Sequence, residues 1–290
     1  MNRFYLCLDV GGTVIKAAPV SSGGVLLAPI SRFPSGASGS REEILDHLAG
    51  ICRRILPENG SLAGIRFAFP GPFDYPEGIC RMRGLQKYDN ICGVNLRQAL
   101  SLRLGVPGDR ILFCNDAAAF ALGEMLRGSG VGVHRILCVC IGTGCGSAFG
   151  VDGRLAPEGF PGVPPQGYIY PLPFLNGCID DYLSRRGLMA LSRERLGTAE
   201  DGMGLARRAA QGDTSARACF LEFGERVRDA LMPIADAFHP QVLCLGGITG
   251  SGELFLPPLR LACQDRGIRL AVTQGTSLRA MEGLSGDFLN

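Results

Sequence analysis

The sequence is poor in lysine and contains no run of basic residues. Only Lys16 and Lys87 are lysines among its 29 basic residues, and the formal net charge is +2. This composition gives no electrostatic reason to expect a nucleic-acid partner, because nucleic-acid backbones select clustered basic side chains. No apolar run approaches the roughly 20 residues of a membrane-spanning helix, so we expect no membrane partner either.

Disulfides and metal clusters also lack support in the sequence. The 12 cysteines form no CxxC pair, and several, such as Cys7 and Cys244, stand inside apolar segments where thiols act as small apolar side chains. No secretory leader opens the chain, so reduced thiols in a cytoplasmic protein are expected. The three histidines are scattered and have no metal-ligand spacing.

What the sequence does contain is a repeated pattern of strand, Gly/Thr turn, strand, Gly turn and strand. The 290 residues, 46% of them hydrophobic, suffice for two domains with large cores. The pattern predicts strands over 4–10, 14–20 and 25–30, and again over 136–141, "SAFGV" and "RLA". Two similar α/β halves are therefore expected.

Helical segments lie between the predicted strands. Residues 41–56 keep one face apolar and open on a capping box of Ser40 and Glu43. "DAAAFALGEMLR" predicts a helix closed by Gly128, and a long helix is expected over 214–239.

The glycine turns are candidate phosphate sites. A turn without side chains exposes backbone N–H groups, which can bind phosphate oxygens, and Thr13 or Thr143 adds a hydroxyl. Asp9, at the tip of the first strand, is a candidate Mg²⁺ ligand. Taken singly, such a turn is more often a hairpin capped by an acid, but two matched turns favour the phosphate interpretation. The sequence has neither the GxxxxGK[ST] nor the GxGxxG loop.

Five segments resemble motifs of the ROK family (repressor, open reading frame, kinase). "DVGGTVIKA" is similar to its first phosphate motif, "FPGPFD" to its sugar-domain turn and "NDAAAFALGE" to its catalytic segment. "IGTGCGSAFGVDGRL" resembles its second phosphate motif and "LGGITGSGE" its nucleotide-base segment. The order and spacing of these segments cover nearly the whole chain.

The resemblance implies an actin-like (ribonuclease H-like) two-domain kinase fold with the active site in the interdomain cleft. We expect a small domain of 1–113 plus about 276–290 and a large domain of 114–275. No helix-turn-helix precedes residue 4, which disfavours the family's repressor branch.

The resemblance also assigns roles to individual residues. Asp116 would be the general base, although on pattern alone Asp116 or Asn115 is more simply the cap of the following helix. Asn115 and Gly71 would bind the sugar. Phosphate, metal and nucleotide contacts would come from Asp9, Gly11, Gly12, Thr13, Lys16, Gly142, Thr143, Gly144, Gly146, Gly246 and Gly247.

The chain departs from the family pattern where many members carry Glu-x-Gly-His. "VPPQGYIYP" puts Pro165 at the Glu position and Tyr168 at the His position, with Gln166 as a candidate substitute. The cysteine-rich zinc segment is reduced to "NGCIDDY", so no zinc site is expected. Asp180 occupies the position of that segment's Glu and is a candidate sugar ligand, with Asp181 as the competing one.

The function expected from these residues is ATP- and Mg²⁺-dependent phosphorylation of a hexose or N-acetylhexosamine. The alternative is a catalytically weak sugar- or nucleotide-binding sensor on the same fold, favoured by the missing Glu and His. A kinase-fold activator ATPase acting on a protein would need cysteines placed for an iron–sulfur cluster, which are absent. The expected partners are the sugar and ATP, and the sequence leaves a homodimer open.

Overall fold

The computed structural model describes residues 3–85, 87–247 and 251–286. It divides the chain into two compact units, Met1–Gly128 with Ser277–Asn290, and Ser129–Thr276. The division after Gly128 lies further along the chain than the expected boundary at 113/114, because the helix that carries Asp116 packs with the first unit. None of the helices in the described ranges has the length and apolarity to span a bilayer.

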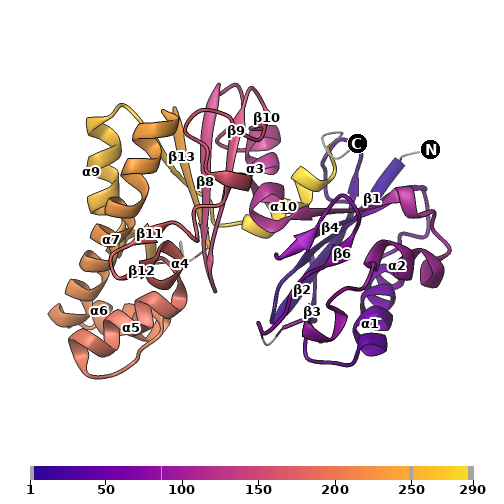
Figure 1. Ribbon diagram of the computed structural model, residues 1–290, viewed down its shortest axis with the longest axis horizontal. Helices are drawn as coiled ribbons and strands as arrows, with labels where there is room; N and C mark the ends of the chain where they lie inside the picture. Colours follow the sequence, from indigo (N-terminus) through magenta and orange to yellow (C-terminus); the bar gives the residue numbers. More distant parts are fainter. Residues whose placement is uncertain (1–2, 86, 248–250, 287–290) are drawn as a thin grey trace. The chain divides into compact units, whose positions relative to one another are not determined.

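The first unit is built on a five-stranded sheet (Figure 1). Its strand order is β3-β2-β1-β4-β7, in which β1, β2 and β3 run antiparallel while β1, β4 and β7 run parallel. The elements are β1 (Arg3–Val10), β2 (Val14–Ser21), β3 (Ser31–Pro34), α1 (Arg41–Arg54), β4 (Ser61–Phe69), β5 (Phe73–Asp74), β6 (Ile79–Cys80), η1 (Asp89–Ile91), α2 (Leu96–Leu104), η2 (Gly108–Arg110), β7 (Ile111–Asn115), α3 (Asp116–Arg127) and α10 (Thr276–Leu284).

The second unit repeats this arrangement. Its sheet has the order β10-β9-β8-β13-β14, again three antiparallel strands followed by parallel ones. The elements are β8 (Arg135–Ile141), β9 (Cys145–Val151), β10 (Arg154–Leu155), η3 (Pro165–Gly167), β11 (Pro173–Phe174), β12 (Gly177–Cys178), α4 (Ile179–Tyr182), α5 (Arg185–Leu196), α6 (Gly202–Ala210), α7 (Thr214–Phe238), β13 (Val242–Gly247), α8 (Gly252–Phe255), α9 (Pro257–Asp265) and β14 (Arg269–Val272). The prediction of two similar α/β halves is confirmed.

The third strand of the first half was predicted wrongly. Residues 25–30 form no strand beyond a single bridge between Val20 and Leu26, and β3 begins at Ser31. The Ser21 amide donates to the Val25 carbonyl and closes a turn, so that Val25 belongs to this turn and not to a strand. The strand β3 then pairs with β2 from Ala17 opposite Ser31 to Val14 opposite Pro34.

The C-terminal helix belongs to the first unit because it packs closely on α3. A Cβ atom on Gly123 would lie 1.7 Å from the Arg279 carbonyl oxygen, and one on Gly283 would lie 2.2 Å from the Ala119 carbonyl oxygen. Only glycine allows the two helix backbones to approach so closely.

Arg66 fixes the end of that helix. The Arg66 side chain is buried on β4 and donates to the carbonyls of Leu284, at 2.7 Å, and Gly286. It satisfies carbonyls at a helix C-terminus, where a cation is also favoured by the helix dipole.

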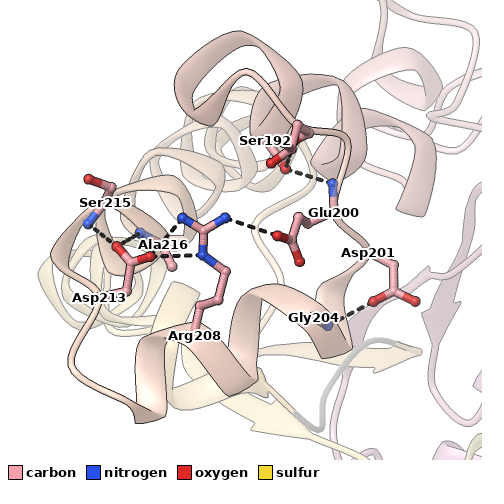
Figure 2. A network of polar contacts seen from close by, with 9 residues as sticks. Ser192, Glu200, Asp201, Gly204, Arg208, Asp213, Ser215 and Ala216 are labelled. Carbon is pink, nitrogen blue, oxygen red and sulfur yellow. Dashed lines mark hydrogen bonds and ion pairs between the residues drawn. The ribbon is translucent and has the colours of Figure 1, made fainter.

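Charged caps organise the helices of the second unit (Figure 2). Asp213 caps α7 by accepting from the amides of Ser215 and Ala216 at 2.9 and 3.1 Å. Arg208 of α6 donates to Asp213 at 2.8 Å and to Glu200 at 2.9 Å. These bonds tie α6 to the start of α7, which contacts α5, α8 and α9 as well.

Candidate active site

The first glycine turn is held by its carbonyl groups. The Tyr88 hydroxyl donates to the Gly11 carbonyl at 3.0 Å, and the Ser35 hydroxyl donates to the Gly12 carbonyl at 2.8 Å. The Ser35 amide donates to the Thr13 carbonyl at 3.0 Å. With the carbonyls bonded to protein groups, exposed Gly12 and Thr13 can present their amides to a phosphate.

Both lysines of the chain lie at this turn. Lys16 is the register partner of Asp9, and its ammonium donates to the Ser277 hydroxyl at 2.6 Å. The Lys87 side chain covers Gly12, since a Cβ there would lie 3.1 Å from Lys87 Cδ. Sequence reasoning did not single out Lys87, although its rarity in a chain with 29 basic residues was a usable signal.

The parallel strands gather the predicted residues at one edge of the first sheet. Asp9 of β1 is in register with Ala68 of β4, and β4 in turn runs parallel to β7. The carboxyl ends of parallel strands share an edge, where ligands commonly bind in open α/β sheets. The first glycine turn, the Gly71 turn and Asn115–Asp116 all follow such ends.

Tyr75 links two of these segments, and the sequence pattern did not reveal it. Its hydroxyl accepts from Asn115 Nδ2 at 3.1 Å and donates to the Phe69 carbonyl at 3.0 Å. A Cβ on Gly71 would lie 3.5 Å from the same hydroxyl. The Gly71 turn and Asn115 are therefore fixed to each other.

Asn115 is the N-cap of α3. Its side-chain oxygen accepts from the amides of Ala117 and Ala118 at 3.0 and 3.1 Å. Asp116 follows as the first helical residue and is exposed to solvent. Desolvation of the carboxyl group by the surrounding protein raises the pKa of Asp116 above its usual 3.8, and repulsion from the Asp9 carboxylate adds to this effect. The Ala117 amide and the Lys87 ammonium lower the pKa and so act in the opposite direction. Contact with water moderates all of these effects.

The second glycine turn lies between β8 and β9. The Gly142 amide donates to the Gly144 carbonyl at 2.8 Å, which closes the turn, and Thr143 at its tip is exposed. The Cys145 amide donates to Asp180 Oδ1 at 2.6 Å. Asp180 is thus brought to this turn, whereas Asp181 accepts from the Cys178 amide and caps α4.

The segment that departs from the family pattern is pinned to β9. The Ser147 hydroxyl donates to the Gly167 carbonyl at 2.6 Å and accepts from the Ile169 amide at 3.0 Å. Gln166 is exposed, has a φ of 57°, and its amide donates to Glu158 at 3.2 Å. The rings of Tyr168 and Tyr170 lie 5.6 Å apart.

The last predicted glycines lie at the carboxyl end of β13. Gly246 and Gly247 pair with Cys140 and Ile141 of β8, directly before the second glycine turn. Gly247 has a φ of +93°, and a Cβ there would lie 1.8 Å from the Ile141 carbonyl oxygen. Residues 248–250 of the nucleotide-base segment lie outside the described residues.

A cavity of about 290 Å³ is lined in part by the residues that come directly after 248–250 in the sequence. Polar and apolar groups both contribute to its wall. The lining residues are Ala206, Ser251, Gly252, Glu253, Leu254, Leu256, Val272 and Gln274.

The donors present fit a weakly held Mg²⁺ and not a protein-caged metal. Within the described ranges no three His, Cys, Asp or Glu side chains are grouped as metal ligands. Mg²⁺ usually keeps several waters and takes one or two carboxylates together with substrate phosphates. Asp9, next to the first glycine turn, can supply such a carboxylate.

The sequence profile of the ROK family matches residues 5–275. The chain belongs to the ROK family. A glucokinase of Thermotoga maritima is 29% identical over 87% of this chain and 84% of its own length. A beta-glucoside kinase of Listeria monocytogenes is 26% identical over 96% and 94%.

Among solved structures, the ROK hexokinase of Thermus thermophilus superimposes with a TM-score of 0.78 at 25% identity, covering 97% of each chain. This ROK protein therefore has the actin-like ATPase fold, and it is glucokinase-like in sequence and fold. The family and fold predicted from the five motifs are confirmed.

Proposed function

We propose that this ROK protein is an ATP-dependent kinase of a hexose or an N-acetylhexosamine, with Asp116 as the general base. The observation that carries the proposal is that Asn115, and not Asp116, caps α3. Asn115 caps the helix, and Asp116 therefore remains free to accept a proton at the edge where the first glycine turn ends. The membership of the family and the sugar-kinase relatives support the same reaction class.

In the reaction, the attacking sugar hydroxyl would transfer its proton to the Asp116 carboxylate while its oxygen forms a bond to the γ-phosphorus of ATP. The bond from the γ-phosphorus to the β–γ bridging oxygen breaks, and ADP leaves with that oxygen. A base whose pKa is raised takes up the proton more readily, and general-base catalysis contributes about 10²–10⁴ in rate. Asn115, fixed by Tyr75, and the neighbouring Gly71 turn orient the sugar.

The phosphate groups require positioning and charge neutralisation. The amides of Gly12, Thr13, Thr143, Gly144 and Gly146 are the proposed ligands, with Lys16 as the nearby cation. Gly11 and Gly142 would shape the two turns, because their amides donate to the carbonyls of Val14 and Gly144. Mg²⁺, when bound through Asp9 and water, would neutralise charge on the phosphates. Gly246, Gly247 and the cavity lined by α8 are proposed for the nucleotide base. Gln166 remains a candidate for the sugar.

The alternative is a sensor that binds sugar or nucleotide and turns over slowly. The observation that favours it is the absence of Glu and His at positions 165 and 168. The two candidates share a fold and differ in turnover.

A coupled assay of ADP release across a panel of hexoses and N-acetylhexosamines, with Mg²⁺ present, tests the proposal. The wild type should turn over at least one sugar. Asp116→Asn should have a kcat about 10²- to 10⁴-fold lower than the wild type and should still bind Mg·ADP. A wild type that binds nucleotide and sugar without turnover would favour the sensor. Wild-type turnover in Asp116→Asn would remove Asp116 from the role of base.

A further inference from the structure

The second glycine turn is held from outside its own sheet. The Arg185 amide donates to the Gly142 carbonyl at 2.7 Å, before the tip of the turn. Asp180 Oδ1 accepts from the Cys145 amide at 2.6 Å, after the tip. The short segment 180–185 therefore forms hydrogen bonds to both ends of the turn.

The Asp180 carboxylate fits closely against the turn. A Cβ on Gly144 would lie 2.7 Å from Asp180 Oδ1, so any larger residue at 144 would displace the carboxylate. The Asp180 side chain is only 23% exposed. Its position is fixed through the backbone as well, since the Asp180 amide donates to the Tyr170 carbonyl at 3.1 Å.

Arg186 occupies the other oxygen of this carboxylate. Arg186 Nη2 donates to Asp180 Oδ2 at 2.6 Å. The ion pair neutralises a negative charge that would otherwise repel an anion at the neighbouring turn. The bond favours one orientation of the carboxylate, although water at the Arg186 side chain, which is 67% exposed, screens the pair.

We propose that Asp180 is a positioning residue for the second phosphate turn, held in place by Arg186, and not a ligand of the sugar. Through the Cys145 amide it fixes the turn in the conformation that receives the transferring phosphate, and Arg186 cancels its charge there. The inference rests on the proposed function, in which this turn binds the nucleotide phosphates. It assigns a role to Arg186 and reassigns Asp180 from sugar to nucleotide.

The test measures Mg·ADP affinity by calorimetry and, for the enzyme, separate KM values for ATP and sugar. Asp180→Ala should weaken Mg·ADP binding and raise the KM for ATP at least about tenfold, which corresponds to about 1.4 kcal/mol. The KM for sugar should stay within about twofold. Asp180→Asn, which keeps an acceptor for the Cys145 amide, should recover part of the nucleotide affinity.

Asp181→Ala is the matched control. It removes a carboxylate one residue away that accepts from the Cys178 amide and thiol, and it should leave both KM values unchanged. Arg186→Gln should weaken Mg·ADP binding while Asp180 is charged, and much less in the Asp180→Asn background. This coupling is the signature of a charge pair.

Three results would overturn the inference: a higher KM for sugar with unchanged nucleotide binding, no change in either, or independent effects of the two substitutions. If Asp180→Ala does not fold, the Asp180→Asn and Arg186→Gln cycle decides the question. The proposed function fails separately, through a wild type that shows no turnover, and the calorimetric comparison still tests Asp180 in that case.

Discussion

Asn115 and Asp116 divide two tasks at the first turn of α3. Asn115 accepts from two backbone amides of the helix and donates to Tyr75. The Asp116 carboxylate accepts from the Ala117 amide, at 2.9 Å, and is not the group that caps the helix. Because Asn115 satisfies the amides at the start of the helix, protonation of Asp116 would not remove the cap of α3.

The first prediction concerns the stability cost of Asp116. Its pKa is raised above 3.8 in the folded protein, so the folded state binds more protons than the unfolded state in the pH range just above 3.8. Stability attributable to this group therefore falls as pH rises through that range. Asp116→Asn should have a higher Tm than the wild type at pH 7, and the difference should vanish below pH 3.8. Calorimetric scans from pH 3 to pH 8 test this. A lower Tm for the variant at pH 7 would show that the helix dipole outweighs the desolvation of the carboxyl group by its surroundings and the repulsion from Asp9.

A second Asp→Asn substitution should act with the opposite sign. The pKa of Asp213 is lowered first by Arg208 and then by the backbone amides that it caps, so this carboxylate stabilises the folded protein above pH 3.8 and loses that contribution as pH falls through its folded pKa. Asp213→Asn keeps the cap acceptor and loses the attraction of Arg208 (Figure 2). Its Tm should lie below the wild type at pH 7 and converge with it in acid. The same scans serve both variants, and shifts of equal sign at pH 7 would contradict the pair of predictions.

Asn115→Ala should affect both stability and substrate binding. Loss of an N-cap costs about 1 kcal/mol of unfolding free energy, and loss of the bond to Tyr75 should raise the KM for sugar. Ser40→Ala is the matched control, because Ser40 caps α1 in a capping box with Glu43 and has no proposed contact with substrate. It should cost a similar free energy in urea unfolding and leave the kinetics unchanged. Equal kinetic effects of the two variants would mean that Asn115 acts on stability alone.

The repeated strand and turn pattern was sufficient to predict two similar α/β halves, because apolar runs and Gly/Thr turns are local signals. The actin-like fold was expected only from the resemblance to the ROK family. The pattern failed for 25–30, where the apolar run is followed by Pro29 and the pairing with β2 is decided by the turn after Ser21. The contact of Asp180 with Cys145 joins residues 35 positions apart. No local pattern encodes such a contact, and for the same reason the sequence could not reveal Tyr75 at the site. For Lys87 the only signal in the sequence was that lysine is rare in this chain.

The protein should not depend on zinc. The segment around Cys178 offers one cysteine where a structural zinc site usually has four Cys or His ligands. A zinc ion bound only to the folded state would stabilise that state by mass action, and its removal would lower the Tm. Because we expect no such ion, incubation with EDTA should leave the Tm unchanged. Elemental analysis of the purified protein should find less than stoichiometric zinc. One zinc per chain, with a Tm that falls in EDTA, would contradict this prediction.

The last prediction is that glucose is a poor substrate. By resemblance, many ROK kinases use a Glu and a His of the Glu-x-Gly-His motif on the early hydroxyls of the sugar, and this chain has Pro165 and Tyr168 there. Pro165 has no side-chain hydrogen-bonding group, and Tyr168 is longer and offers a phenol hydroxyl in place of an imidazole.

The segment cannot readily rearrange to replace these contacts. Ser147 bonds to it at Gly167 and Ile169. Gln166 has a left-handed φ of 57°, and its backbone N–H donates a hydrogen bond to Glu158. The loss of each neutral hydrogen bond weakens binding by about 0.5–1.5 kcal/mol, and a bond to a charged group by more.

We therefore expect steady-state kinetics on glucose, mannose, fructose, allose, N-acetylglucosamine and N-acetylmannosamine to give glucose a lower kcat/KM than at least one other sugar. The paired substitution Pro165→Glu with Tyr168→His should raise kcat/KM for glucose, because it restores a carboxylate and an imidazole to the pinned segment. Tyr170→His is a control that places an imidazole on the same segment at a position outside the motif, and it should not raise glucose turnover. Glucose emerging as the best wild-type substrate, with kcat/KM of about 10⁴ M⁻¹s⁻¹ or above, would show that Gln166, Tyr168 or other groups rebuild the missing contacts.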